Sequence, residues 1–262
     1  MGRPSESVAG PQGRVGQFVV ECGFSHALPD DPIVHPGEPG ASHLHVFFGS
    51  AVADSDVSLS EMLDGSTTCD SEGDTASYWA PALLDDGTLI QPDKSVAYYR
   101  AGVGVDPEDV VPFPPGLRMI AGDASAVEPQ PVTVAAWSCG VGADRSSRPP
   151  QCPSGRGLRM DVVFPDCWDG ENLDVPGHRR HMRYSTDGTC PESHPVHVPQ
   201  LIFTVAYPVT GDVSHLRLAS GDPITVHADF INAWNDESLA REVALCLNRD
   251  AVCGVTSGRI SG

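Results

Sequence analysis

The chain has 262 residues, enough for one large domain with a substantial core. Its formal net charge is −19 and Lys94 is its single lysine, so phosphate backbones and anionic lipid surfaces are unfavourable partners. No segment is apolar for long enough to enter a bilayer. We therefore expect neither a nucleic-acid partner nor membrane insertion. With 27 glycines and 24 prolines, the composition favours many short elements over long helices.

The predicted elements begin with a flexible lead-in over residues 1–13, and a single β-rich domain follows over 14–262. Apolar or alternating runs bounded by turn residues predict strands over 17–21, 43–48, 78–83, 96–100, 117–121, 132–139, 158–164, 201–207, 216–218 and 224–230. An Asp-Asp-Gly turn at 85–87 separates two of these strands. Near the C-terminus, Asp236 can cap a helix whose apolar face comprises Leu239, Val243, Cys246 and Leu247.

This pattern predicts a mainly β fold, a single-domain β-sandwich or jelly-roll-like structure with one C-terminal helix. Eight cysteines without a C-x-x-C pair indicate four disulfides that staple long loops, as is typical of exported proteins. Chain order favours nearest-neighbour pairs, among many possible connectivities: Cys22–Cys69, Cys139–Cys152, Cys167–Cys190 and Cys246–Cys253. The cysteines therefore predict a secreted, extracellular protein. Because Met1 leads directly into polar residues, we expect that its leader is absent from this chain.

The sharpest motif is the pair His43 and His45 in Ser-His-Leu-His-Val-Phe-Phe-Gly. On a strand, residues i and i+2 leave the same face with their Cβ atoms about 6.6 Å apart. Two imidazoles at this spacing, joined by a third distant ligand, form a common zinc or copper site. We therefore predict that His43 and His45 bind one divalent metal, zinc or copper. The alternative is that both rings only pack inside a β-layer.

Candidate partners for this pair lie further along the chain. His227 and Asp229 repeat the i, i+2 spacing on another predicted strand, where a carboxylate can orient an imidazole or act as a ligand. His181 lies three residues after His178 in the loop between two cysteines, and His194 precedes a proline that favours extended backbone. We predict catalytic roles for His181, His194, His227 and Asp229.

Chemistry without a metal has its own candidates. Tyr184 can donate a proton in a lyase-type elimination with a histidine as base, and Arg118 can neutralise a substrate carboxylate. A carboxylate pair drawn from Glu21, Asp30, Asp31 and Asp166 is the alternative for glycoside hydrolysis. Flat aromatic faces suit sugar rings, so we expect substrate binding by Trp79, Trp168 and Tyr98. Serine-hydrolase, H-E-x-x-H, phosphate-loop and Rossmann motifs are absent from the sequence.

Several runs in one order carry a resemblance over most of the chain. They include Asp31-Pro32-Ile33-Val34, Ser42-His43-Leu44-His45, Tyr78-Trp79-Ala80-Pro81, Phe113-Pro114-Pro115-Gly116, Phe164-Pro165-Asp166-Cys167-Trp168, His178-Arg179-Arg180-His181 and His227-Ala228-Asp229-Phe230. With these runs the chain resembles a family of secreted fungal and bacterial proteins catalogued as domain of unknown function nineteen-ninety-six. The resemblance implies export and work on polysaccharide or cell-wall material.

Together these observations predict an exported enzyme that cleaves extracellular polysaccharide or cell-wall material, by hydrolysis or lyase-type elimination, through a histidine-rich site. In the sharpest form of this prediction the site holds a divalent metal. The alternative is a non-catalytic carbohydrate-binding or cell-wall protein in which the histidines are structural. The expected partner is a polysaccharide or a small-molecule substrate.

Overall fold

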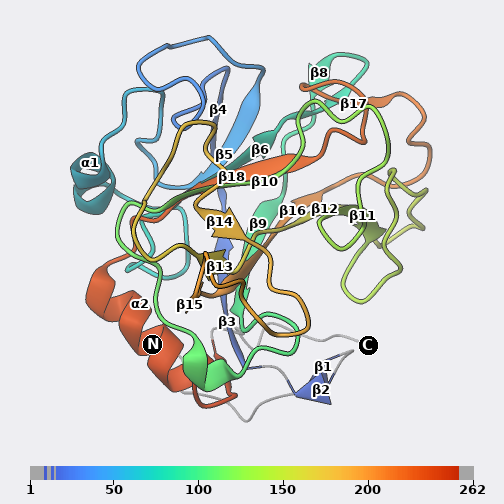
Figure 1. The fold of residues 1–262 in the computed structure, drawn as a ribbon. Coiled ribbons are helices and arrows are strands. Elements are labelled where there is room, and N and C mark those ends of the chain that lie inside the picture. Colours follow the sequence, from blue (N-terminus) through green and yellow to red (C-terminus); the bar gives the residue numbers. More distant parts are fainter. Residues whose placement is uncertain (1–8, 11–12, 15, 254–262) are drawn as a thin grey trace.

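Two antiparallel sheets form the body of the molecule in a computed structural model that describes residues 9–10, 13–14 and 16–253 (Figure 1). The five-stranded sheet has the order β10 (Arg118–Gly122), β18 (His227–Ile231), β6 (Ser77–Pro81), β5 (His45–Gly49) and β4 (Phe24–Leu28). The six-stranded sheet has the order β11 (Ala135–Cys139), β12 (Leu158–Val163), β16 (Gln200–Tyr207), β9 (Lys94–Arg100), β3 (Gln17–Cys22) and β19 (Val252–Cys253). Only β19, which lies parallel to β3, departs from the antiparallel pattern in these two sheets as described.

The two sheets pack face to face through aromatic side chains. Tyr78 of β6 stacks on Phe203 of β16 with ring centroids 5.6 Å apart, and Phe48 of β5 meets the same ring edge-on. These residues belong to one large buried core to which both sheets contribute. The predicted mainly β sandwich is confirmed, and among the described residues no helix has the length and apolarity needed to cross a membrane.

A second, smaller core covers the outer face of the five-stranded sheet. Phe47 and Trp79 point away from the main core because side chains alternate along a strand. They meet Met62 of α1 (Leu59–Asp64) and Ile33 of the preceding loop. Ser58 and Glu61 form a capping box at the start of α1, which the strand-based prediction missed. The part of the outer face around Phe47 and Trp79 is therefore covered and not open to solvent.

Smaller elements complete the fold. One three-stranded sheet contains β13 (Cys167–Trp168), β14 (Met182–Arg183) and β15 (Val196–His197). A second contains β17 (Leu216–Leu218), β7 (Leu83–Asp85) and β8 (Thr88–Leu89). A two-stranded sheet contains β1 (Ala9–Gly10) and β2 (Gly13–Arg14). Asp86 and Gly87 both have positive φ and close the hairpin between β7 and β8, at the predicted turn. A 3-10 turn covers Pro107–Asp109.

The C-terminal helix is confirmed with two adjustments. Helix α2 (Asp236–Glu242) is capped by Asn235, whose side chain accepts from the Ser238 amide, so Asp236 is the first helical residue and not the cap. A π-helical turn, Val243–Leu247, continues α2 and carries the rest of the predicted apolar face into the core. Most of the predicted lead-in lies outside the described residues.

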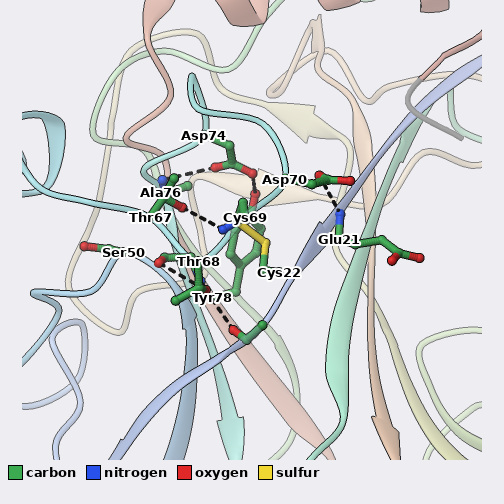
Figure 2. Close-up of a disulfide and its surroundings, with 12 residues drawn as sticks. Glu21, Cys22, Ser50, Thr67, Thr68, Cys69, Asp70, Asp74, Ala76 and Tyr78 are labelled. Atoms are coloured by element: carbon green, nitrogen blue, oxygen red, sulfur yellow. Dashed lines mark hydrogen bonds between the residues drawn. A yellow bond between two sulfur atoms is a disulfide. The ribbon is translucent and has the colours of Figure 1, made fainter. Parts of the chain in front are cut away.

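Four disulfides join nearest neighbours in the chain, as predicted: Cys22–Cys69, Cys139–Cys152, Cys167–Cys190 and Cys246–Cys253. No described cysteine is free. Figure 2 shows the first disulfide beside Asp74, whose carboxylate lies between the Ala76 amide and the Tyr78 hydroxyl. Such crosslinks are typical of extracellular proteins.

Candidate metal centre

His45 and His227 lie on the outer face of the five-stranded sheet, where two strands begin. His45 is the first residue of β5 and His227 the first of β18, and β6 runs between them and ends at Pro81, opposite His45. Phe48 and Phe230, three residues further along each strand, point into the main core. Alternation therefore directs both imidazoles to the opposite face, beneath the loop that precedes β5.

Hydrogen bonds to the backbone fix the orientation and tautomer of these two rings. His45 Nδ1 donates to the Asp30 carbonyl at 2.9 Å, and His227 Nδ1 donates to the Thr225 carbonyl at 2.9 Å. Each Nε2 consequently carries a lone pair and no proton in the neutral ring. The two Nε2 atoms face each other at 3.5 Å, with no hydrogen to share between them.

His43 completes a group of three imidazoles. The predicted strand included His43, but β5 begins two residues later, so His43 lies at the end of the preceding loop. Its Nε2 is 3.2 Å from His227 Nε2, and its ring centroid is 4.2 Å from that of His45. The ring nitrogens of all three residues lie within 4.8 Å of one another. His43 is only half-buried and is therefore the side of the cluster that solvent reaches.

Two carboxylates lie next to the imidazoles. Oxygen atoms of Asp31 and Asp229 and a ring nitrogen of His45 lie within 4.8 Å of one another, and all three residues are buried. Asp31 Oδ1 accepts the amides of Ile33 and Val34 at 3.0 and 2.9 Å, so this carboxylate is held in place. Asp229 Oδ2 is buried and has no hydrogen-bond partner. An unsatisfied buried carboxylate oxygen costs free energy unless a ligand occupies its lone pairs.

Burial keeps the imidazoles neutral, which is the form that binds metals. Desolvation, helped by the neighbouring rings, lowers the pKa of His45 to about 3 and that of His227 to about 3. Desolvation also lowers the pKa of His43. Burial and the nearby charge of Asp31 raise the pKa of Asp229 well above its ordinary value.

The loop before β5 is folded around two consecutive aspartates. Asp30 Oδ1 accepts the Gly40 amide at 2.8 Å and its Oδ2 accepts the Ser55 amide at 3.2 Å. These bonds fix the Asp30 backbone, whose carbonyl holds His45. Short acidic side chains that accept backbone amides are the usual way to stabilise such a loop without regular structure.

His181 and His194 lie outside the cluster. His181 Nε2 donates to the Arg118 carbonyl at 2.6 Å, and His194 Nε2 donates to the Arg180 carbonyl at 2.8 Å. The two histidines hold the backbone at Arg118 and Arg180, and neither has a ring nitrogen grouped with those of His43, His45 and His227. His178 is similarly tied, through Nδ1, to the Asp174 carboxylate at 2.9 Å.

The structure does not bring the three expected aromatic residues to one surface. Trp79 is completely buried in the second core and offers no face to a sugar. Tyr98 lies on the six-stranded sheet, pointing away from the core that its neighbours Ala97 and Tyr99 enter, so it lies on the other outer face of the sandwich. Trp168 packs on the core edge and donates from Nε1 to the Asn172 carbonyl at 2.7 Å.

The remaining predicted site residues are engaged in local contacts. Tyr184 donates its hydroxyl to the Val163 carbonyl at 2.8 Å, and burial raises its pKa, so it is a poor proton donor to a substrate. Arg118 lies 3.8 Å from the Asp174 carboxylate, at the edge strand β10. Neither side chain contacts the three imidazoles.

Sequence reasoning missed Asp31 as a member of this cluster and missed Arg179 altogether. Asp31 was considered only for glycoside hydrolysis, although its position before Pro32 marks it as a loop anchor. Arg179 follows His178 in an exposed loop, and its charge acts on Asp229. No spacing or motif distinguishes such an arginine from an ordinary surface residue.

Three other groups of described residues bring possible donors together, but each includes a disulfide. These are Cys167, Cys190 and His197; Cys22, Cys69 and Asp74; and Glu242, Cys246 and Cys253. Sulfur binds metals as a thiolate, which a disulfide does not provide. The histidine cluster is therefore the best-supported metal site in the part of the chain that the structure describes.

Comparison with known proteins places the chain in a family. No curated protein and no solved structure matches it. The model of DUF1996, described as a domain of unknown function, matches residues 31–234, a span that includes all three imidazoles and both carboxylates of the cluster. The chain therefore belongs to the DUF1996 family.

Proposed function

We propose that this protein is a zinc-dependent enzyme that cleaves extracellular polysaccharide or cell-wall material. Its centre is formed by His43, His45 and His227, with Asp229 as a fourth ligand or as a partner of the metal-bound water. Hydrolysis suits this donor set best, since three-histidine zinc sites activate water.

The spacing of the ring nitrogens carries the proposal. Zinc–nitrogen bonds of about 2.0–2.1 Å in a tetrahedral site place two ligand nitrogens about 3.3 Å apart. The Nε2 atom of His227 lies 3.2 Å from that of His43 and 3.5 Å from that of His45. Ligands at right angles, as copper(II) favours, would be about 2.9 Å apart. These two distances are closer to the tetrahedral value, which is the geometry that zinc adopts.

The lone pairs support the same conclusion. His45 and His227 each use Nδ1–H for a backbone carbonyl, so their Nε2 lone pairs face each other across 3.5 Å. Two buried lone pairs repel unless a cation lies between them, and His43 Nε2, 3.2 Å from His227 Nε2, can donate a proton to only one of them. The carbonyl acceptors are the outer partners that metal-bound histidines usually have.

The residues of the chain have separable tasks in this proposal. His45 and His227, fully buried and oriented by carbonyls, supply rigid ligands; His43 supplies a ligand at the solvent side. Asp229 presents an unpartnered carboxylate oxygen beside them, and Asp31 keeps that region negative. A bound zinc ion would lower the pKa of a water molecule in its open position to about 7. The four disulfides agree with work outside the cell.

The test combines metal analysis with a substrate screen. Protein purified without a histidine tag is expected to contain one zinc ion per chain, removable by a chelator and restored by added zinc. The loaded protein is then incubated with a panel of polysaccharides, and products are detected by reducing-end and unsaturated-sugar assays. A chain that contains no metal, and gains no thermal stability from zinc or copper, would exclude the proposal. Binding of a glycan without products, unchanged in His43→Ala, would instead identify a carbohydrate-binding protein.

A further inference from the structure

We propose that Arg179 binds a carboxylate of the substrate beside the histidine cluster, so that the substrate is an acidic sugar such as a uronate. This inference rests on the proposed function, because it assigns a substrate class to the same site. It concerns a residue with no part in holding the metal.

Arg179 is an exposed cation without a partner. In the part of the chain that the structure describes, no hydrogen bond and no ion pair within 4.0 Å engages its guanidinium, whereas Arg118 and Arg148 each lie beside an aspartate. The chain has a net charge of −19, so acidic partners for a surface arginine are abundant. An arginine left unpaired in such a chain is available for an anionic ligand.

The backbone that carries Arg179 is held on several sides. His178 has a left-handed φ of 55°, and its ring donates to the Asp174 carboxylate. The Arg179 carbonyl accepts the Met182 amide at 3.2 Å, and the Arg180 carbonyl accepts from the ring of His194. Of these anchors, His178, Asp174 and His194 are not among the proposed metal ligands. Because these contacts hold the backbone at Arg179 in one conformation, less conformational entropy is lost when its side chain binds a ligand.

This loop is fastened to the strand next to the cluster. His181 donates to the carbonyl of Arg118, the first residue of β10. Along β10, Ile120 pairs with Asp229 and Gly122 pairs with His227. The loop is thus attached to the strand that borders both site residues.

The charge of Arg179 reaches the same group of residues. It lowers the pKa of Asp123, the residue that follows Gly122, and Gly122 pairs with His227. Asp123 directly follows β10 and in addition senses His227. Arg179 therefore lies within electrostatic reach of the end of β10 that borders His227.

A carboxylate suits this position because guanidinium groups bind planar carboxylates through two parallel hydrogen bonds. A polymer dense in sulfate or phosphate is disfavoured by the overall negative charge. A sugar acid with one carboxylate per residue needs only one local cation. Arg179 would then orient the substrate, while the metal centre acts on a neighbouring bond.

The experiment uses the full chain loaded with cobalt(II), whose visible spectrum reports on ligands at the metal. Glucuronate is titrated, with glucose and inorganic phosphate as comparison ligands. We expect glucuronate to bind and glucose not to, and we expect Arg179→Gln to weaken glucuronate binding at least tenfold. Arg179→Lys should retain part of the affinity, because it keeps the charge without the bidentate geometry. Arg180→Gln, the exposed neighbour, is the matched control and should bind as the wild type does.

The outcomes are separable. Metal content is measured for every variant, so a chain that binds no cobalt or zinc excludes the proposed metal centre itself. In that case calorimetric titration with glucuronate still decides the role of Arg179. Equal glucuronate affinity in Arg179→Gln and wild type, or equal loss in Arg180→Gln, would overturn the inference. Binding of phosphate in preference to glucuronate would overturn the assignment of a carboxylate.

Discussion

Two buried polar regions of this molecule have opposite hydrogen-bonding character. In the interior, Trp234 donates to the Tyr99 hydroxyl at 3.0 Å, Tyr99 contacts the Tyr78 hydroxyl, and Tyr78 donates to Asp74 at 2.7 Å. Asp74 also accepts the Ala76 amide at 3.1 Å (Figure 2). When Asp74 is ionised, every donor in this chain of bonds has an acceptor. On the outer face, the Nε2 atoms of His45 and His227 face each other with no proton between them.

The difference separates a structural network from the proposed ligand site. A satisfied chain of bonds between the two sheets strengthens itself and needs nothing from outside. His43 Nε2 can donate to His227, but the His45 Nε2 lone pair and the unpartnered oxygen of Asp229 then have no donor, which is costly in a buried place. Both regions are buried and polar, so the balance of donors and acceptors is the feature that distinguishes them.

The largest expected effect on zinc binding comes from breaking the histidine cluster. His45→Ala or His227→Ala removes a buried ligand and should weaken zinc binding by more than about 100-fold, since loss of an outer partner alone costs about 10–100-fold. Zinc at about 100 times its dissociation constant should stabilise the wild type by about 2.7 kcal/mol. That corresponds to a rise in Tm of about 5–10 °C. Calorimetric titration and thermal melts with and without zinc measure both quantities.

His26→Ala is the matched control for these variants. His26 lies on β4, beside β5, where its ring stacks on Phe47 and its Nε2 donates to the Ala53 carbonyl at 2.7 Å. Its removal should destabilise the fold yet leave zinc affinity unchanged. If His26→Ala weakens zinc binding as much as His45→Ala does, the effect is one of general stability and the assigned ligands are wrong.

The sequence predicts half of the cluster because strand periodicity is local. The i, i+2 spacing puts His43 and His45 together, and likewise His227 and Asp229. It does not reveal which distant histidine joins the first pair. That depends on sheet order, in which only β6 separates β18 from β5, and on backbone carbonyls that engage His181 and His194 elsewhere. Trp79 shows the same limit, since alternation predicts its strand and not the second core that covers it.

The fold is easier to predict from the sequence than the site, because the patterns that predict strands and helices are local. Predicted strands such as 17–21 and 201–207 correspond to β3 and β16 within a residue or so, and adjacent cysteines pair as chain order suggests. Helix α1 was missed because six residues are too few to establish a helical period, although Ser58 and Glu61 carry its capping signal. Short local patterns are read from the sequence; contacts between distant segments are not.

The next effect tests the interior network through pH. Burial raises the pKa of Asp74 to about 7, with a smaller contribution from the charge of Asp70 and opposing hydrogen bonds from Tyr78 and Ala76. The folded state thus holds a proton that the unfolded chain releases above pH 4, so the free energy of unfolding should fall as pH rises from about 4 to about 7. Asp74 accounts for up to about 4 kcal/mol of this fall.

Asp74→Asn isolates this contribution. The amide oxygen can still accept the Ala76 amide, while the titrating group is gone. Urea unfolding of both proteins between pH 4 and pH 8 should show that the wild type loses stability relative to Asp74→Asn as pH rises. Parallel curves over that range would show that Asp74 is not protonated in the folded protein. Because the comparison is a difference between two variants, other groups that titrate in the same range cancel.

The smallest effect distinguishes the two regions most directly. Tyr99→Phe removes one hydroxyl from the interior network and leaves the Trp234 indole N–H without its acceptor. A buried donor without a partner costs about 1–3 kcal/mol, so urea unfolding should show a loss of this size. Zinc affinity should not change, because Tyr99 points into the main core and the histidines lie on the outer face of the other sheet. A change in zinc affinity without a loss of stability would mean that the interior network serves the metal centre, and that the balance of donors and acceptors does not separate structure from site in this fold.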